Sequence, residues 1–188
     1  MKSSRRGTLR VVSGTARGLR FTTSPGTDTR PTSDRVREAV FNALDSLGAV
    51  EGALVLDAYA GSGALGIEAA SRGAAHVTYV ERDNAARAVL VDNLKSTGLE
   101  ATATVQGGDG MRAVASGEPW DLVLIDPPYA FSEWPMLLDV VAGCLAPAGV
   151  AVLESDRAIE LPSSLHAIRT KQYGSTVVVF AALTGAHT

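Results

Sequence analysis

The stretch VLDAYAGSGALG, residues 55–66, decides the fold of this chain. Apolar residues lead to Asp57, glycines follow at positions 61, 63 and 66 in the spacing GxGxxG, and a helical pattern begins directly after them. Glycines in such a loop let the backbone approach a ligand closely, and the helix that follows presents unpaired N–H groups at its N-terminus. The stretch therefore predicts a strand, a ligand-binding turn and a helix, although the motif alone does not identify the ligand.

Outward from this loop, apolar runs alternate with amphipathic segments. The pattern predicts strands at 53–58, 76–81, 101–106, 121–125 and 149–154, and helices at 34–47, 65–72, 84–96, 111–116 and 134–144. Strands that alternate with helices pair in parallel through crossover connections, which gives an open α/β sheet with helices on both faces. Two last strand-like stretches, 167–173 and 176–183, leave no room for a helix between them, so we expect an antiparallel hairpin at the sheet edge.

Charge is distributed unevenly along the chain. The formal net charge is −3, but residues 1–37 hold nine Lys or Arg and two Asp or Glu, whereas the remainder holds eight and eighteen. Residues 9–23 are typical of two short strands around a glycine-containing turn, and they carry Arg10, Arg17 and Arg20. A basic hairpin on an acidic body suits nucleic acid, because phosphate contacts supply most sequence-independent affinity. A solvated basic tail is the alternative interpretation.

Length and composition exclude several other classes of protein. The 188 residues, 46% of them hydrophobic, suffice for one domain with one core. The single cysteine, Cys144, lies in an apolar stretch, so we expect a buried thiol and no disulfide. No apolar run approaches the ~20 residues that span a bilayer. We therefore expect a cytoplasmic monomer that contacts no membrane and holds no metal.

Two carboxylates at predicted strand ends indicate which ligand the glycine loop binds. Asp57 stands at the carboxyl end of its strand, where a carboxylate repels a pyrophosphate and attracts a cation. The α-ammonium and sulfonium groups of S-adenosylmethionine are both positive, so Asp57 favours this cofactor over a dinucleotide. Glu81 ends the next strand, a usual position for the acidic residue that accepts hydrogen bonds from a ribose diol. A helix-capping Asp57 and an exposed strand-end Glu81 are the structural alternatives.

The turn after the third of these strands supplies two weaker candidates. Asp109, in GGDGM, could accept from the adenine amino group, and Met111 could line the pocket of the ring. Turns rich in glycine also recruit aspartate for backbone reasons, which is the alternative for Asp109. With Gly61 and Gly63, these residues extend the predicted cofactor site.

The stretch DLVLIDPPYAF, residues 121–131, predicts the chemistry. An exocyclic amine on a nucleobase is a poor nucleophile, because its lone pair is delocalised into the ring. Asp126 and the Pro127 carbonyl can each accept one N–H, which favours a pyramidal nitrogen, while Pro127 and Pro128 hold both acceptors rigidly. Tyr129 can stack on an extruded base. Asp126 would orient the amine and stabilise developing positive charge, so the stretch favours an enzyme that methylates a nucleobase amine.

Several stretches resemble the RsmD-type methyltransferases, which methylate N2 of guanine 966 in bacterial 16S ribosomal RNA. The resemblance rests on LRVVSGTARGLRF at 9–21, RPTSDRVREAVFNAL at 30–44, LDAYAGSGALGIEAASRGA at 56–74, VERD at 80–83, LIDPPY at 124–129 and QYGSTVVVF at 172–180. Many amino-methylating enzymes share the glycine loop and DPPY, but not the segment at 30–44. Tyr59 departs slightly from the family, where phenylalanine is common.

The resemblance implies a class I, Rossmann-like methyltransferase fold with a seven-stranded, mostly parallel sheet and an antiparallel C-terminal edge strand. It divides the chain into a hairpin extension that binds RNA, residues 1–29, and a catalytic domain, residues 30–188. It also implies that Arg30, Thr32 and Arg35 are candidate ligand or RNA contacts, with Arg30 assigned to the cofactor and Arg35 to the RNA. A capped, solvated helix start is the alternative for Thr32 and Arg35. The implied product of the cofactor is S-adenosylhomocysteine, and the implied partner is 16S rRNA in the small ribosomal subunit or its assembly intermediate.

Three other functions compete with this hypothesis. A DNA adenine-N6 methyltransferase uses DPPY equally well, but such enzymes usually add a target-recognition region, and only the basic N-terminal segment is available here. Glutamine-N5 protein methyltransferases carry NPPY in place of DPPY. A binding module without chemistry would not need Asp126.

Overall fold

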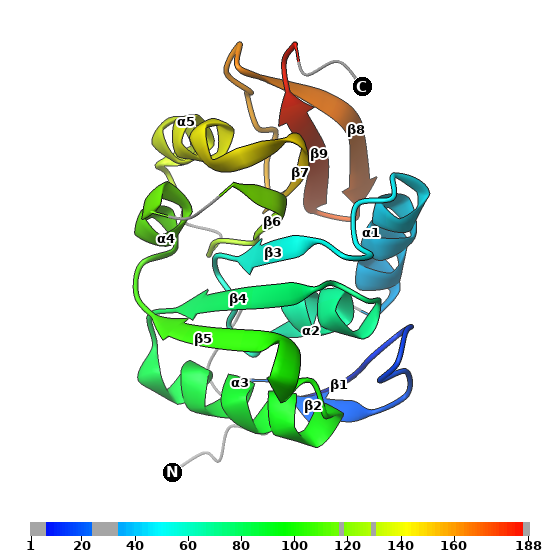
Figure 1. Cartoon of the computed structure of the whole chain (residues 1–188). Coiled ribbons are helices and arrows are strands. Elements are labelled where there is room, and N and C mark those ends of the chain that lie inside the picture. The colour runs from blue at the N-terminus through cyan, green and yellow to red at the C-terminus, as the bar shows by residue number, and fades with distance from the viewer. Residues whose placement is uncertain (1–6, 24–33, 117–118, 129–130, 186–188) are drawn as a thin grey trace.

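The computed structural model of the chain (Figure 1) describes residues 7–23, 34–116, 119–128 and 131–185. It contains one seven-stranded sheet in the order β5-β4-β3-β6-β7-β9-β8, and a separate two-stranded hairpin, β1-β2. The strands of the sheet are β3 (Leu54–Asp57), β4 (His76–Glu81), β5 (Ala103–Gly107), β6 (Trp120–Ile125), β7 (Leu145–Ser155), β8 (Leu165–Tyr173) and β9 (Thr176–Leu183). The predicted α/β sheet is therefore confirmed.

Strand directions follow from the connections. The first five strands in this order pair in parallel, because a helix or a helical turn returns the chain between them. β8 and β9 are joined by a tight turn and pair antiparallel. β9 also pairs antiparallel with β7, so it lies between β7 and the edge strand β8. The expected C-terminal hairpin and its antiparallel edge strand are both present.

Helices cover both faces of the sheet and form two cores. The helices are α1 (Asp34–Ser46), α2 (Ala64–Ser71), α3 (Asn84–Thr97), α4 (Gly110–Ser116) and α5 (Trp134–Cys144). One core contains residues of α1, α2 and α3, and the other contains residues of α4 and α5. Cys144 is a buried free thiol at the end of α5, as expected. Among the described residues, no helix is long and apolar enough to cross a membrane.

Two strand boundaries differ from the sequence prediction. β7 begins at Leu145, earlier than expected, because α5 passes directly into the strand and Leu145 pairs with Trp120 across an irregular register. β5 begins at Ala103, because a short 3₁₀ helix, Glu100–Thr102, occupies the residues before it. Both differences arise from packing, which apolar periodicity does not report.

The predicted basic hairpin consists of β1 (Thr8–Arg10) and β2 (Arg20–Thr22). It is not a separate layer, because its Val11, Ala16 and Phe21 are buried in the same core as α1, α2 and α3. Figure 1 shows the hairpin beside α3, at the opposite end of the sheet from β8. The division of the chain at residue 29 stays a prediction.

Candidate active site

The glycine loop between β3 and α2, residues 58–63, is shaped by close packing on one side and open space on the other. Gly63 has a φ of +89°, and an added Cβ would lie 2.4 Å from Leu90 Cδ1 of α3. Gly61 has a φ of +53°, and an added Cβ would have no neighbour within 4 Å. Both positions favour glycine for their backbone conformation. The loop therefore rests on α3, and Gly61 faces the open side where a ligand can approach.

Asp57 is buried at the carboxyl end of β3, with 2% of its surface exposed. Its Oδ2 accepts a hydrogen bond from the N–H of Gly66 at 3.0 Å. Burial raises the pKa of Asp57 to about 7, opposed by the Gly66 hydrogen bond and assisted by the negative charges of Asp126 and Glu81. A bound cation would relieve this repulsion and restore the charge. The site therefore fits the cationic methionine portion of S-adenosylmethionine.

Glu81, at the end of β4, binds the glycine loop directly. One carboxylate oxygen, Oε2, accepts from the N–H of Gly61 at 2.9 Å, and the other, Oε1, accepts from the N–H of Asp83 at 2.7 Å. The side chain thus fixes the open side of the loop against the start of α3. Contact with a ribose, which the sequence predicts for Glu81, stays a prediction.

Asp109 and Met111 lie where the chain enters α4. Asp109 is exposed, and its Oδ1 accepts from the N–H of Arg112 at 3.2 Å, so it caps the helix. Met111 is half-buried and packs against the core of α4 and α5. An added Cβ on Gly110 would lie 2.2 Å from the carbonyl oxygen of Ala58, so α4 begins against the glycine loop. The adenine contacts of Asp109 and Met111 stay predictions.

The start of the DPPY sequence lies beside Asp57. β6 pairs in parallel with β3 with Leu124 opposite Asp57, and Asp126 follows two residues later. Asp126 is exposed, and its charge contributes to the raised pKa of Asp57. The structure therefore brings carboxylates from the ends of β3, β4 and β6 to one edge of the sheet, where open α/β sheets bind their ligands.

The two prolines form a turn that leads out of β6. Pro127 is buried and Pro128 is exposed, and the carbonyl oxygen of Pro128 accepts from the N–H of Phe131 at 2.8 Å. Tyr129, the predicted stacking residue, Arg30, a predicted cofactor contact, and Thr32, a candidate ligand or RNA contact, lie outside the described residues.

Three aromatic rings lie near this turn; the sequence distinguishes Tyr59 only as a departure from the family and predicts no site role for Phe131 or Trp134. Phe131 contacts Tyr59 edge-on at 5.9 Å between ring centroids and Trp134 at 5.4 Å. Burial, with the nearby charges of Asp109 and Glu133, raises the pKa of Tyr59 to about 12, so its hydroxyl stays neutral. The rings connect the glycine loop to the segment after the prolines. The DPPYAF stretch contained the signal, because Phe131 follows Tyr129 closely.

The predicted RNA-binding arginines lie on the hairpin surface. Leu9 pairs with Phe21 toward the core, and Arg10 pairs with Arg20, so these two arginines share the outer face. Both are exposed, as is Arg17 in the connecting loop. We call Arg10, Arg17 and Arg20 the hairpin arginines. Their side chains are available to phosphate groups, and their contact with RNA stays a prediction.

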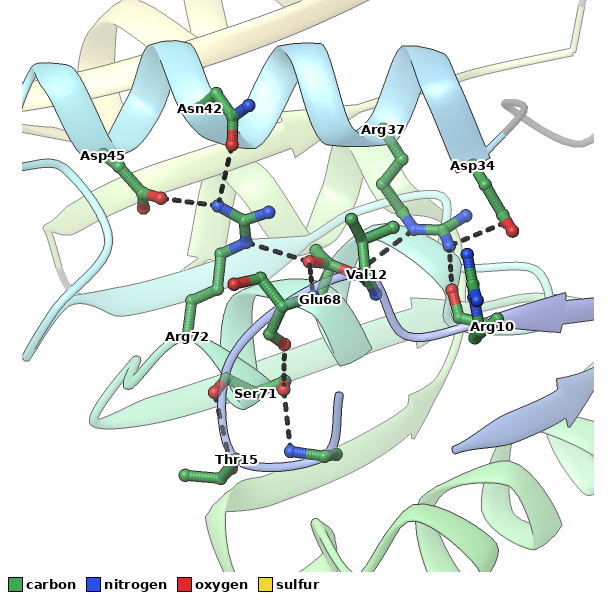
Figure 2. A network of polar contacts seen from close by, with 12 residues as sticks. Arg10, Val12, Thr15, Asp34, Arg37, Asn42, Asp45, Glu68, Ser71 and Arg72 are labelled. Atoms are coloured by element: carbon green, nitrogen blue, oxygen red, sulfur yellow. Dashed lines mark hydrogen bonds and ion pairs between the residues drawn. The ribbon is translucent and has the colours of Figure 1, made fainter. Parts of the chain in front are cut away.

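A buried carboxylate of α2 fixes the hairpin loop to that helix (Figure 2). Glu68 of α2 is fully buried and accepts from the N–H groups of Val12 at 2.9 Å and Ser13 at 3.0 Å. The same carboxylate pairs with Arg72 at 2.8 Å and with Arg37 at 3.5 Å. A charge so deeply buried requires such partners, and here they come from three separate segments of the chain.

Arg37 belongs to the basic N-terminal segment but is not part of its surface, which the charge count of the sequence could not show. Its side chain is buried, and its guanidinium donates to the carbonyl oxygen of Arg10 and pairs with Asp34 at 3.0 Å. It therefore anchors the hairpin and adds nothing to the basic surface. Arg35, two residues earlier on α1, is exposed, and its predicted contact with RNA stays a prediction.

The described residues contain no group of three or more His, Cys, Asp or Glu arranged to hold a metal ion. The three carboxylates of the site lie at the ends of β3 and β4 and directly after β6.

A family model and curated relatives that match this chain agree on one protein family. The family model described as Conserved hypothetical protein 95 matches residues 9–182. Ribosomal RNA small subunit methyltransferase D of Escherichia coli is 36% identical over 168 residues, which cover 85% of this chain and 83% of that protein.

Two solved structures extend the comparison. The structure of yhhF from Escherichia coli superposes with a TM-score of 0.82 at 34% identity, and covers 94% of this chain and 98% of its own. The Thermus thermophilus 16S rRNA N2 G1207 methyltransferase, RsmC, solved in complex with AdoMet and guanosine, gives a TM-score of 0.73 at 25% identity. That match covers 95% of this chain and 50% of the RsmC chain.

Proposed function

The chain belongs to the Conserved hypothetical protein 95 family, the RsmD-type methyltransferases, and from this premise we propose that it methylates N2 of guanine 966 in 16S rRNA. It is an S-adenosylmethionine-dependent methyltransferase of ribosomal RNA. The observation that carries the proposal is the meeting of Asp57, Glu81 and Asp126 at one edge of the sheet. Asp57 and Glu81 adjoin the glycine loop, and Asp126 begins the turn that would hold the base.

The cofactor is assigned to the residues around the glycine loop. When bound, S-adenosylmethionine supplies a methyl group on a sulfonium centre. Asp57 would bind the cationic end of the cofactor, because its buried carboxylate lies between two other negative charges. Glu81 holds the N–H of Gly61 in place and would accept from the ribose diol with its remaining lone pairs. Asp109, Met111 and Arg30 are proposed to contact the cofactor from the two flanking segments.

The substrate amine is assigned to the turn after β6. Asp126 and the Pro127 carbonyl would each accept one N–H of guanine N2, which directs the nitrogen lone pair toward the methyl group. Pro127 is buried, and the rings of Pro127 and Pro128 fix φ at both positions, which would hold the two acceptors in place. Asp126 would stabilise the positive charge that develops on nitrogen, and Tyr129 would stack on the base.

The RNA is assigned to the hairpin arginines and Arg35. Phosphate contacts position a nucleic acid without reading its sequence, which suits exposed arginines on a fixed support. We further propose that residues 1–29 form the RNA-binding extension of a monomeric, cytoplasmic enzyme. Its substrate would be the small ribosomal subunit or an assembly intermediate, and its second product S-adenosylhomocysteine.

Labelled methyl transfer tests the reaction and the target together. The protein is incubated with labelled S-adenosylmethionine and either small ribosomal subunits that lack the modification or naked DNA, and the modified nucleoside is identified by mass spectrometry. We expect N2-methylguanosine at position 966 of the subunit RNA. Subunits already methylated at this position are the control and should accept no label.

Other outcomes would replace the proposal. N6-methyladenine in DNA would be consistent with the proposed roles of Asp126 and Pro127, but it would show that the enzyme is a DNA methyltransferase. Label at another guanine would leave the chemistry intact and refute the target. Transfer to neither substrate would favour a protein glutamine as the acceptor, or a binding module.

A further inference from the structure

Asn93, on the third turn of α3, is a buried polar residue that the proposed reaction does not use; 2% of its surface is exposed. Its Oδ1 accepts from the N–H of Thr22 at 2.9 Å, and its Nδ2 donates to the carbonyl oxygen of Thr22 at 2.8 Å. The side-chain amide thus pairs with both backbone groups of a β2 residue, as a neighbouring strand would. β2 is thereby fixed to α3.

The second N–H of the same amide reaches the glycine loop. Nδ2 also donates to the carbonyl oxygen of Ser62 at 2.8 Å. Ser62 lies between Gly61 and Gly63, the two loop residues with left-handed backbone. Asn93 therefore contacts the basic hairpin and the glycine loop at once, and both donors and the acceptor of its side chain are used.

The Asn93 amide lies between the glycine loop and β2, so it can affect the position of both. Leu90, one turn earlier on α3, packs against Gly63, so α3 supports the loop at that residue, whereas an added Cβ on Gly61 would meet no neighbour within 4 Å. Thr22 ends the strand that carries Arg20. A shift of the Asn93 amide would therefore move the loop that faces the cofactor and the strand that faces the RNA.

We propose that Asn93 is a positioning residue that holds the glycine loop and the basic hairpin in one fixed arrangement. The inference rests on the proposed function, because it takes the loop as the cofactor site and the hairpin as the RNA site. Asn93 is buried and its amide is bonded to protein backbone, so we assign it no direct contact with either ligand. Asn93 affects the binding of both ligands because its side-chain amide is hydrogen-bonded to backbone groups of the glycine loop and of the hairpin.

The substitution Asn93→Asp tests this with almost no change of shape. An ionised carboxylate has no donor and a protonated one has a single donor, so at least one of the two carbonyl oxygens loses its partner. An unsatisfied buried carbonyl displaces the segment that carries it or remains at a cost. We expect the dissociation constants for S-adenosylhomocysteine and for an RNA fragment containing guanine 966 each to rise about tenfold.

A matched control is available on α1. Asn42 is exposed, and its Oδ1 accepts from Arg72 at 3.4 Å, a contact that a carboxylate also makes. Asn42→Asp therefore makes the same substitution without removing a buried donor, and should leave both dissociation constants unchanged. Calorimetry with S-adenosylhomocysteine and fluorescence anisotropy with the RNA give the affinities without any turnover.

The readout separates positioning from loss of folding. An irreversibly unfolded fraction lowers the number of molecules bound per chain and leaves the dissociation constant unchanged, whereas reversible unfolding raises both apparent dissociation constants by the inverse of the folded fraction. Urea titration of each variant gives that fraction, so a rise of the dissociation constants in a variant that is fully folded without urea reports a misplaced loop and hairpin. If Asn93→Asp does not fold, Asn93→Ala, which removes the side chain and leaves space for water, is measured in its place.

Two results would overturn the inference. Wild-type affinity for both ligands at full stoichiometry would show that Asn93 positions neither element. Weakened binding of one ligand alone would show that the two elements are not held together by this residue. Failure of the wild-type protein to bind S-adenosylhomocysteine or the RNA is a different outcome, because it would refute the proposed function itself.

Discussion

The raised pKa of Asp57 makes cofactor binding depend on pH. Burial and two neighbouring carboxylates raise this pKa from 3.8 to about 7. Each unit corresponds to roughly 1.4 kcal/mol, so ionising Asp57 without a ligand costs about 4 kcal/mol relative to the unfolded chain. A cationic ligand favours the ionised form. Below pH 7 binding must first remove a proton, and the affinity should fall up to about tenfold per pH unit.

The same pKa affects the stability of the cofactor-free protein with a defined sign. The folded state holds the proton more tightly than the unfolded state, so its stability from this group is full below pH 4. That contribution is lost progressively as the pH rises from 4 to 7. Ligand affinity and ligand-free stability should therefore change in opposite directions across this range.

Calorimetric titration with S-adenosylhomocysteine between pH 5.5 and 8.5 measures the affinity, and urea denaturation at the same pH values measures the stability. Asp57→Asn is the control, because an amide can still accept from the N–H of Gly66 but does not titrate in this range. The variant should bind weakly and without this pH dependence. Equal affinity of the wild-type protein at pH 5.5 and 8, or wild-type affinity in the variant, would refute the assignment of Asp57.

Three further predictions follow from the contacts. Asp126→Ala should lower methyl transfer at least about 100-fold while the affinity for S-adenosylhomocysteine stays unchanged, and joint loss of both would contradict the division of roles. Replacement of the hairpin arginines by glutamine should reduce the slope of log affinity for RNA against log salt by roughly two units, and an unchanged slope would show that RNA binds elsewhere. Glu68→Gln should lower the free energy of unfolding by about 3 kcal/mol in urea titrations, because Arg37 and Arg72 both lose the buried carboxylate that they share and keep only the more exposed Asp34 and Asp45 as acidic partners. A loss below about 1 kcal/mol would mean that the charge of Glu68 is not needed.

Local patterns in the sequence were sufficient for much of the fold and for the polar residues of the candidate site. Asp57, Glu81 and Asp126 each end an apolar strand, and parallel strands bring such ends to one edge, so their proximity follows from the topology. The role of each individual residue is harder to predict from the sequence. Asp109 is a predicted adenine contact, and the structure shows its hydrogen bond as a helix cap; both uses favour the same residue in the same turn.

The contacts that join distant segments could not be predicted in this way. Arg37 stands in a basic segment and resembles its exposed neighbours, yet it pairs with a carboxylate 31 positions away. Glu68 and Asn93 occupy helices as ordinary polar residues would, and nothing in helical periodicity marks them as buried. Only the packing of the hairpin against α2 and α3 removes them from water.

The docking of the hairpin also sets an order of events during synthesis. The hydrogen bond of Val12 cannot form until Glu68, 56 positions further along the chain, has been synthesised. The hydrogen bond of Thr22 likewise requires Asn93, 71 positions further along. At 5–20 residues per second, a ribosome needs roughly 4 to 14 s to make that second partner. Contacts of such long range also form slowly, because they must first close a large loop of chain. The basic segment is made before its partners in α2 and α3, and it acquires its fixed place only after both helices have left the ribosome.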